Sequence, residues 1–370
     1  MIFPRLRCLG GASLIVFGML LSPALAQVPV ESNLKVFNYT YTYTTPGYTN
    51  LSGTINLAPT TVTRTIPVKI YIPAAGTYNS AVPLPVVTYL HGAGERGNGT
   101  DVNEGNVDGT GLDSWAFSDS LQLIDRPAIY IAPRGIASFG ASDPEYLENN
   151  ARWGSTASAN YGYNSFGEFW LNNYGASDAY NYQEFPISAS LRGAMGLPDY
   201  LTSSSSLTDI NGNSIALPLM DSNRQYLVGW SSGGDGVWDA VVRAPHKYAA
   251  AIPVSGVGDP GAFFGSNAVA GLESQAVRAF AGSLEVDDLG NPNDQQTSIA
   301  KMQAAMSSRG AIGTAQILPG QDHFTISNAV FGDPANRDWL FAQSSAVVPE
   351  PATLAFYGVG LFVLRCRRKA

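Results

Sequence analysis

The chain has 370 residues, of which 45% are hydrophobic and 14% are charged. This apolar content is enough for a large core, and the charge content is too low for an intrinsically disordered chain. The formal net charge is −8, and no block of basic residues lies in the middle of the sequence, which argues against a nucleic-acid partner.

The first 26 residues have the order of a secretory signal peptide. Arg5 and Arg7 precede the apolar stretch 14–21, and a small-residue site at 24–26 comes directly before Gln27. A positive start, a short apolar centre and a small-residue cleavage site define such a signal. We therefore expect signal peptidase to release a chain that begins at Gln27.

The last 22 residues, 349–370, also have the order of a targeting signal. Pro349-Glu350-Pro351 leads into the apolar run 354–364, and the basic cluster 365–369 follows. This order resembles the PEP-CTERM sorting signal of Gram-negative bacteria that make exopolysaccharide, which an exosortase-like enzyme processes. The alternative is an ordinary C-terminal anchor helix. At about 1.5 Å per residue the run is only ~16 Å long, against a hydrocarbon core of ~30 Å, which favours transient anchoring at the inner membrane.

We predict that the precursor is cut near 349–351 and released as a cell-envelope or extracellular protein. Mass spectrometry of the mature protein checks this, and we expect peptides that start at Gln27 and end near residue 349. A secreted form that keeps residues 365–370 would contradict the processing. A protein found only in the cytoplasm would contradict export.

The remaining region, 27–348, has no thiol, because the two cysteines of the chain are Cys8 and Cys366. This excludes disulfides, zinc–thiolate sites, iron–sulfur clusters and cysteine nucleophiles from it.

Within this region, short apolar segments alternate with helix-like segments. The predicted strands are residues 39–44, 68–73, 85–90, 128–132, 225–228, 249–254, 277–281 and 315–318. The predicted helices are residues 188–202, 233–243 and 298–309. Such alternation predicts one α/β domain with a mostly parallel sheet flanked by helices.

The strand 225–228 runs into the sequence Gly229-Trp230-Ser231-Ser232-Gly233, and a predicted helix follows. A G-x-S-x-G motif between a strand and a helix is typical of a nucleophile elbow. The free N–H groups at the start of the helix favour an oxyanion there. Ser231 is therefore the candidate nucleophile, and a glycine-rich turn with an idle serine is the alternative.

A second glycine-rich loop, 91–97, follows the strand 85–90 and begins His91-Gly92-Ala93-Gly94. It resembles the H-G-x-G loop that supplies an oxyanion donor in α/β-hydrolases. We expect the backbone N–H groups of Ala93 and Ser232 to hold the oxyanion, and His91 to brace the loop.

The chain has three histidines, and elimination leaves His323 as the candidate base. His91 belongs to the oxyanion loop, and His246 follows the helix after the elbow, at the opposite end of the sheet. His323 follows the last predicted strand and leaves room for the family order of nucleophile, acid and histidine.

The sequence offers three candidates for the acid. Related hydrolases carry an H-G-x-x-D pattern after the strand 277–281, and counting from Gly282 places the acid at Glu285. Asp287 and Asp288 remain alternatives.

The segments 91–97, 129–134, 221–236 and 245–256 together resemble the secreted esterase and depolymerase branch of the α/β-hydrolases. This branch includes feruloyl-esterase-like and polyhydroxyalkanoate-depolymerase-like proteins and predicted peptidases. The resemblance implies acyl transfer without a metal or other cofactor: Ser231 attacks a carbonyl, His323 moves the proton, and a carboxylate orients His323.

An insert at about 143–186 departs from the family pattern. It is rich in aromatic residues, among them Trp153, Tyr161, Tyr163, Trp170 and Tyr174. A long insert near the carboxyl ends of the strands is typical of a lid or a substrate platform. The aromatic side chains can equally form a small core of their own. Trp170 and Trp230 are the candidate substrate contacts.

These observations predict a secreted serine hydrolase that cleaves carboxylic esters, with polysaccharide-linked acyl groups or a polyester as candidate substrates. A serine peptidase of the same fold is one alternative. A non-catalytic envelope or matrix protein is the other, and it would require a broken triad.

Overall fold

The computed structural model describes residues 33–49, 52–92, 126–136, 142–144, 147, 187–258, 272–286 and 292–345. The expected signal peptide, the sorting signal and most of the insert 143–186 lie outside these residues. In the part of the chain that is described, no helix is both long and apolar enough to cross a membrane.

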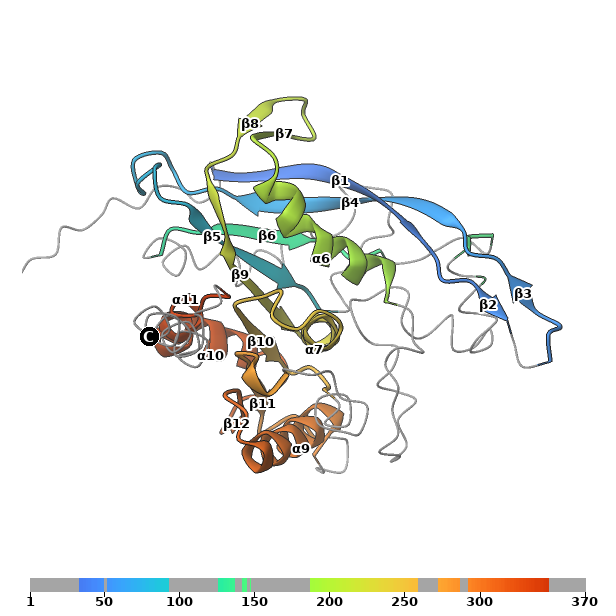
Figure 1. Ribbon diagram of the computed structural model, residues 1–370. Helices are drawn as coiled ribbons and strands as arrows, with labels where there is room; N and C mark the ends of the chain where they lie inside the picture. Colours follow the sequence, from blue (N-terminus) through green and yellow to red (C-terminus); the bar gives the residue numbers. More distant parts are fainter. Residues whose placement is uncertain are drawn as a thin grey trace, which may run out of the picture.

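The described part of the chain is organised around an eight-stranded sheet with the order β1-β4-β6-β5-β9-β10-β11-β12 (Figure 1). Its strands are β1 Leu34–Thr44, β4 Thr61–Tyr71, β5 Leu84–Leu90, β6 Ile129–Pro133, β9 Met220–Trp230, β10 Ala250–Val254, β11 Arg278–Gly282 and β12 Thr314–Leu318. β1 and β4 pair antiparallel, as do β4 and β6, and every other neighbouring pair is parallel.

Helices cover both faces of this sheet. α6 (Ala189–Thr202), α7 (Ser232–Arg243) and α9 (Asp294–Arg309) pack on one face, and α10 (Ile326–Gly332) and α11 (Pro334–Phe341) pack on the other. A 3₁₀ turn, Leu272–Ser274, precedes β11. Strands β5, β6 and β10 are buried along their whole length, as expected for parallel strands with both faces covered. The expected fold class is therefore confirmed.

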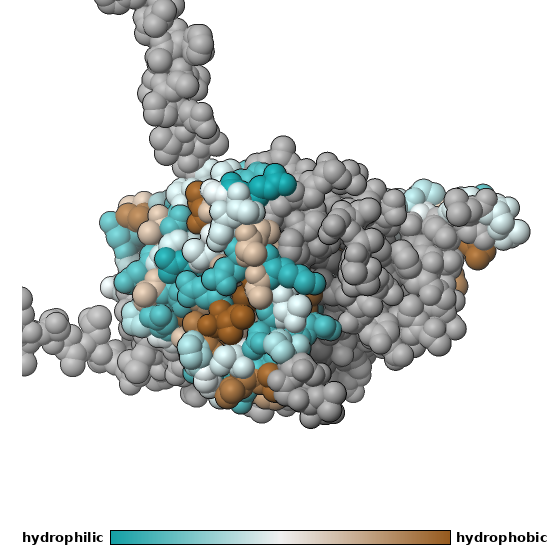
Figure 2. Space-filling model, turned by 90° about the horizontal axis from the view of Figure 1, so that it is seen from below, coloured by the Kyte–Doolittle hydropathy of each residue, from teal (hydrophilic) through white to brown (hydrophobic). Residues whose placement is uncertain are grey.

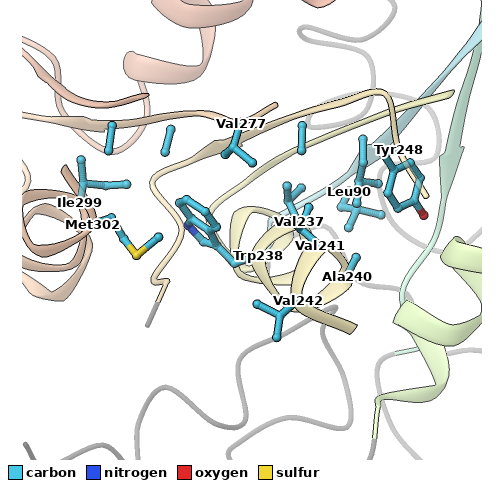
Figure 3. Close-up of a cluster of buried hydrophobic side chains, with 14 of the residues drawn as sticks. Leu90, Val237, Trp238, Ala240, Val241, Val242, Tyr248, Val277, Ile299 and Met302 are labelled. Atoms are coloured by element: carbon cyan, nitrogen blue, oxygen red, sulfur yellow. The ribbon is translucent and has the colours of Figure 1, made fainter. Parts of the chain in front are cut away.

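Among the described residues, the largest fully buried side chain is that of Trp238 in α7. It lies toward Ile299 and Met302 of α9, while Val237 and Val241 of the same helix lie toward Leu90 (Figure 3). This cluster fixes α7 against the sheet, and α7 begins directly after the candidate nucleophile.

The underside of the molecule, near α9 and β12, mixes hydrophilic residues with apolar patches (Figure 2).

The strand predicted at 39–44 is part of a longer ribbon formed by β1 and β4. Alternate tyrosines of β1, at 39, 41 and 43, stack on one another, and the alternating threonines, at 40, 42 and 44, point the other way. These threonines pair with threonines of β4 at hydroxyl distances of 2.8, 2.9 and 3.2 Å. Such cross-strand pairs each contribute about 0.2–1 kcal/mol.

Two-stranded hairpins extend from this framework: β2 (Tyr48–Thr49) with β3 (Asn56–Leu57), and β7 (Ser206–Thr208) with β8 (Ser214–Ala216). The first residue of the predicted insert is tied to the ribbon. The guanidinium of Arg64 donates to both carboxylate oxygens of Asp143, at 2.7 Å each, and both side chains are mostly buried.

Candidate active site

The candidate nucleophile lies in a sharp turn between β9 and α7. β9 ends at Trp230, α7 begins at Ser232, and Ser231 between them has φ 57° and ψ −125°. A residue other than glycine rarely adopts a positive φ, and this conformation costs about 1–3 kcal/mol. The Ser231 N–H donates to the Val254 carbonyl at 2.9 Å, which anchors the turn to β10. Strand, strained serine and helix are the arrangement of an α/β-hydrolase elbow.

The glycines of the motif are required by close backbone approach rather than by their own φ angles. A Cβ atom at Gly233 would lie 1.9 Å from the Leu90 carbonyl oxygen, and one at Gly229 would lie 2.4 Å from the Gly233 oxygen. α7 therefore starts in direct backbone contact with the end of β5. Only residues without a side chain permit this approach.

Gly233→Ala should destabilise the protein by about 3 kcal/mol or more, because the new methyl group meets backbone atoms that no rotamer change can move. Thermal unfolding followed by circular dichroism measures this. Gly196→Ala on α6 is the matched control, since its Cβ would meet only the Tyr39 hydroxyl, at 3.0 Å. An unchanged melting temperature for Gly233→Ala would contradict the close approach.

The structure brings Ser231, His323 and Glu285 into one hydrogen-bonded chain. His323 Nε2 lies 3.0 Å from Ser231 Oγ, and His323 Nδ1 lies 2.7 Å from Glu285 Oε1. The His323 side chain is 28% exposed, whereas the Glu285 side chain is fully buried. Because a carboxylate only accepts hydrogen bonds, Nδ1 carries the proton, and the Nε2 lone pair faces the serine hydroxyl.

Glu285 is held by Gly282, the last residue of β11. Its second oxygen, Oε2, accepts the Gly282 N–H at 2.9 Å, and Gln296 of α9 donates to the Gly282 carbonyl at 3.0 Å. Both carboxylate oxygens are therefore satisfied, as a buried carboxylate requires. Asp287 and Asp288, the alternatives for the acid, lie outside the described residues.

The turn that carries His323 is shaped by its neighbour Asp322. One Asp322 carboxylate oxygen accepts the N–H groups of Thr325 and Phe324 and the Thr325 hydroxyl. These bonds, those from Thr325 foremost, hold the pKa of the Asp322 carboxyl below its usual range. Asp322 is consequently ionised at neutral pH and keeps the turn closed.

Of the two expected oxyanion donors, only Ser232 is described. It is the first residue of α7, and the N–H groups of a first helical turn have no acceptor within the helix. Ala93 lies outside the described residues. Its neighbour Gly92 lies beside the nucleophile, since a Cβ there would be 3.4 Å from Ser231 Cβ.

The other two histidines are placed away from the reacting atoms. His91 is completely buried: its Nδ1–H donates to the Gly92 carbonyl at 2.7 Å, and its Nε2 accepts the Gly135 N–H at 2.8 Å. His246 follows α7, at the end of the sheet where β10 begins. Its backbone N–H donates to the side-chain oxygen of Gln275.

Of the two tryptophans expected to contact substrate, the structure describes only Trp230. Trp170 lies outside the described residues. Trp230 is partly buried at the end of β9, and its indole N–H donates to the His323 carbonyl at 2.8 Å.

Two contacts of the site were not predicted from the sequence: the Asp322 turn and the Trp230–His323 hydrogen bond. The first has a local signal, because an aspartate that precedes a threonine by three residues favours a side-chain-capped turn. The second joins residues that are 93 positions apart, and the sequence holds no signal for it.

No protein-family model matches the chain, and no curated protein sequence does. Among solved structures, a thermostable esterase is 18% identical with a TM-score of 0.48, over 80% of this chain and 70% of that one. A fluorophosphonate-binding serine hydrolase of Staphylococcus aureus is 14% identical with a TM-score of 0.42, over 83% and 99%. A feruloyl esterase module of Clostridium thermocellum, complexed with sinapinate, is 15% identical with a TM-score of 0.37, over 82% and 88%. With TM-scores below 0.5 and identities of 18% or less, these likenesses assign no activity to the chain.

Proposed function

We propose that the protein is a serine hydrolase that cleaves carboxylic esters through an acyl-enzyme. One observation carries this proposal: the continuous chain from Ser231 Oγ through the His323 imidazole to the buried Glu285 carboxylate, with distances of 3.0 and 2.7 Å. A nucleophile, a base in contact with it and a group that orients the base are the three parts that acyl transfer needs.

The reaction follows from the protonation state of the imidazole. As Ser231 Oγ attacks the ester carbonyl, its proton passes to His323 Nε2, and the resulting imidazolium is stabilised by Glu285. The imidazolium then gives this proton to the departing alkoxide, so that the alcohol leaves and the acyl group stays on Ser231. A water molecule, deprotonated by Nε2 in the same way, attacks the acyl-enzyme; the bond from the acyl carbon to Ser231 Oγ breaks, Nε2 returns the proton to Oγ, and the acid leaves.

The developing oxyanion needs donors that are fixed before the reaction begins. We assign this role to the Ser232 N–H at the start of α7 and to the Ala93 N–H. Removing one such donor in other hydrolases costs about 10²–10³ in kcat. The nearness of Gly92 to Ser231 supports the assignment of its neighbour.

A hydrolysis panel on the mature protein tests the proposal. It compares acetyl, longer acyl and aryl esters with a peptide amide, and uses Ser231→Ala as the inactive control. We expect ester cleavage that disappears in the control. Faster cleavage of the amide than of the esters would favour the peptidase, and a correctly folded protein that cleaves neither would contradict the proposal.

A further inference from the structure

Trp230 is in contact with three separate parts of the site. It directly precedes Ser231, its indole N–H donates to the His323 main-chain carbonyl, and its ring edge lies against Gly92 in the loop after β5. A Cβ at Gly92 would be only 3.0 and 3.1 Å from the indole atoms Cζ3 and Cε3. The His323 imidazole also lies close to the indole, with a distance of 5.2 Å between the ring centroids.

The backbone of Trp230 is also fixed. It is the last residue of β9, and it pairs with Val254 of β10 in the parallel ladder. The indole is therefore anchored to the sheet at its own backbone and confined by Gly92 at its ring edge. A hydrogen bond donated from such a group defines a position in space for the atom that accepts it.

His323 needs such a fixed point, because it lies in the loop between β12 and α10. The Asp322 turn closes this loop internally, through hydrogen bonds among residues 322–325. The Leu284 N–H donates to the Gln321 carbonyl at 2.9 Å, which joins the loop to the turn that carries Glu285. The Trp230 bond instead joins the loop to β9, the strand that carries the nucleophile.

We infer that Trp230 is a positioning residue, which sets the distance from His323 to Ser231 through the main chain of His323. This inference rests on the proposed function and goes beyond it, because the sequence predicts Trp230 only as a substrate contact. A displacement of about 1 Å between catalytic groups can cost about 10²-fold in rate. Loss of one neutral hydrogen bond should displace His323 by less than this distance, and the loss in rate should be correspondingly smaller.

Two variants of Trp230 separate the indole N–H from the bulk of the ring. Trp230→Phe removes the donor and one ring, and benzothienylalanine at position 230 replaces only the N–H by sulfur. For both we expect kcat to fall about tenfold, by the same factor for a small acetyl ester and a bulky aryl ester. KM should stay within about twofold, since the altered group acts on the base rather than on the substrate.

Trp339→Phe is the matched control. Trp339 is a partly buried tryptophan of α11 that packs under the guanidinium of Arg278, with 4.6 Å from the guanidinium carbon to the ring centroid. This variant loses an indole from a helix that packs on the sheet, but it leaves the His323 loop unchanged. We expect its kcat to equal that of the wild type.

A spectroscopic readout reports the position of His323 without turnover. The Nδ1 proton between His323 and Glu285 should give a downfield proton resonance in the wild type and in Trp339→Phe. In both Trp230 variants it should be weakened or broadened. If Trp230→Phe fails to fold, the sulfur isostere still provides this comparison.

Three results would overturn the inference: wild-type kcat in both Trp230 variants, a loss confined to KM of the bulky ester, or an unchanged Nδ1 resonance. The second result would return Trp230 to the role of a substrate contact. Labelling of Ser231 by a fluorophosphonate distinguishes these failures from a failure of the proposed function. If the wild type is not labelled, the hydrolase assignment fails, while the resonance comparison still tests whether Trp230 positions His323.

Discussion

Replacing Ser231 or His323 with alanine should each lower kcat by about 10³-fold or more, and the double variant should be no slower than the worse single variant. The two residues act as one unit, because the serine hydroxyl is a weak nucleophile until the imidazole accepts its proton. Steady-state kinetics on the best ester of the panel measures all three variants. Additive losses would show that the two side chains act independently and would contradict the relay.

Matched controls exist for both substitutions. Ser308→Ala changes an exposed serine of α9, and His246→Ala changes the histidine at the far end of the sheet. Both should keep wild-type kcat. Ester hydrolysis that survives the loss of Ser231 would contradict the serine mechanism as a whole.

Glu285→Gln should lower kcat by about 10²-fold or more, because the amide has nearly the same shape as the carboxylate but cannot stabilise the imidazolium that forms during the reaction. Asp287→Asn and Asp288→Asn should each change kcat by less than about threefold. Kinetics on these three variants assigns the acid. A large loss at Asp287 or Asp288, with a small one at Glu285, would move the assignment to that aspartate.

The length of the Glu285 side chain is part of this prediction. Its two oxygens reach in different directions, one to His323 Nδ1 at 2.7 Å and the other to the Gly282 N–H at 2.9 Å. Glu285→Asp shortens the side chain by one methylene and should lose one of the two contacts. A measurable drop in kcat for Glu285→Asp would show that glutamate is not interchangeable with aspartate at this position.

The strands were predictable where the apolar pattern is continuous or strictly alternating. Each predicted strand overlaps a strand of the structure, but several boundaries differ. β9 starts at Met220, five residues before the predicted start, because its first half is polar and partly exposed. α9 starts at Asp294, where the side chain of Asn293 caps it by accepting the Gln296 N–H.

The two last helices were not predicted, although they cover one face of the sheet. α10 has seven residues, too few for an apolar period to be recognised, although Ile326 and Val330 are spaced for one helix face. α11 has a local signal, since Asp333 caps it and Pro334 follows at its first position. Tertiary packing against the sheet stabilises both helices, and a single sequence shows little of that packing.

The site was predictable where chemistry is tied to a motif. The strand–glycine–serine–helix pattern marks Ser231, and counting from Gly282 marks Glu285, which the structure brings to His323. The bond from Trp230 to His323 was not predictable, because it depends on how β9 and the loop after β12 meet in space. Ala93, Trp170 and the two ends of the chain lie outside the described residues and stay predictions.

The order of the strands places the relay residues of the proposed enzyme and its predicted insert in different stretches of the chain, which bears on how the two can evolve. β9, β10, β11 and β12 follow one another both along the chain and across the sheet, and all three relay side chains come from this contiguous stretch. The predicted insert at 143–186 belongs to the preceding half of the chain and meets the described fold at the Arg64–Asp143 pair. Insertions there therefore leave the number of residues between Ser231, Glu285 and His323 unchanged. We predict that a lineage with this arrangement can exchange residues 143–186 as one segment while it inherits the relay residues unchanged.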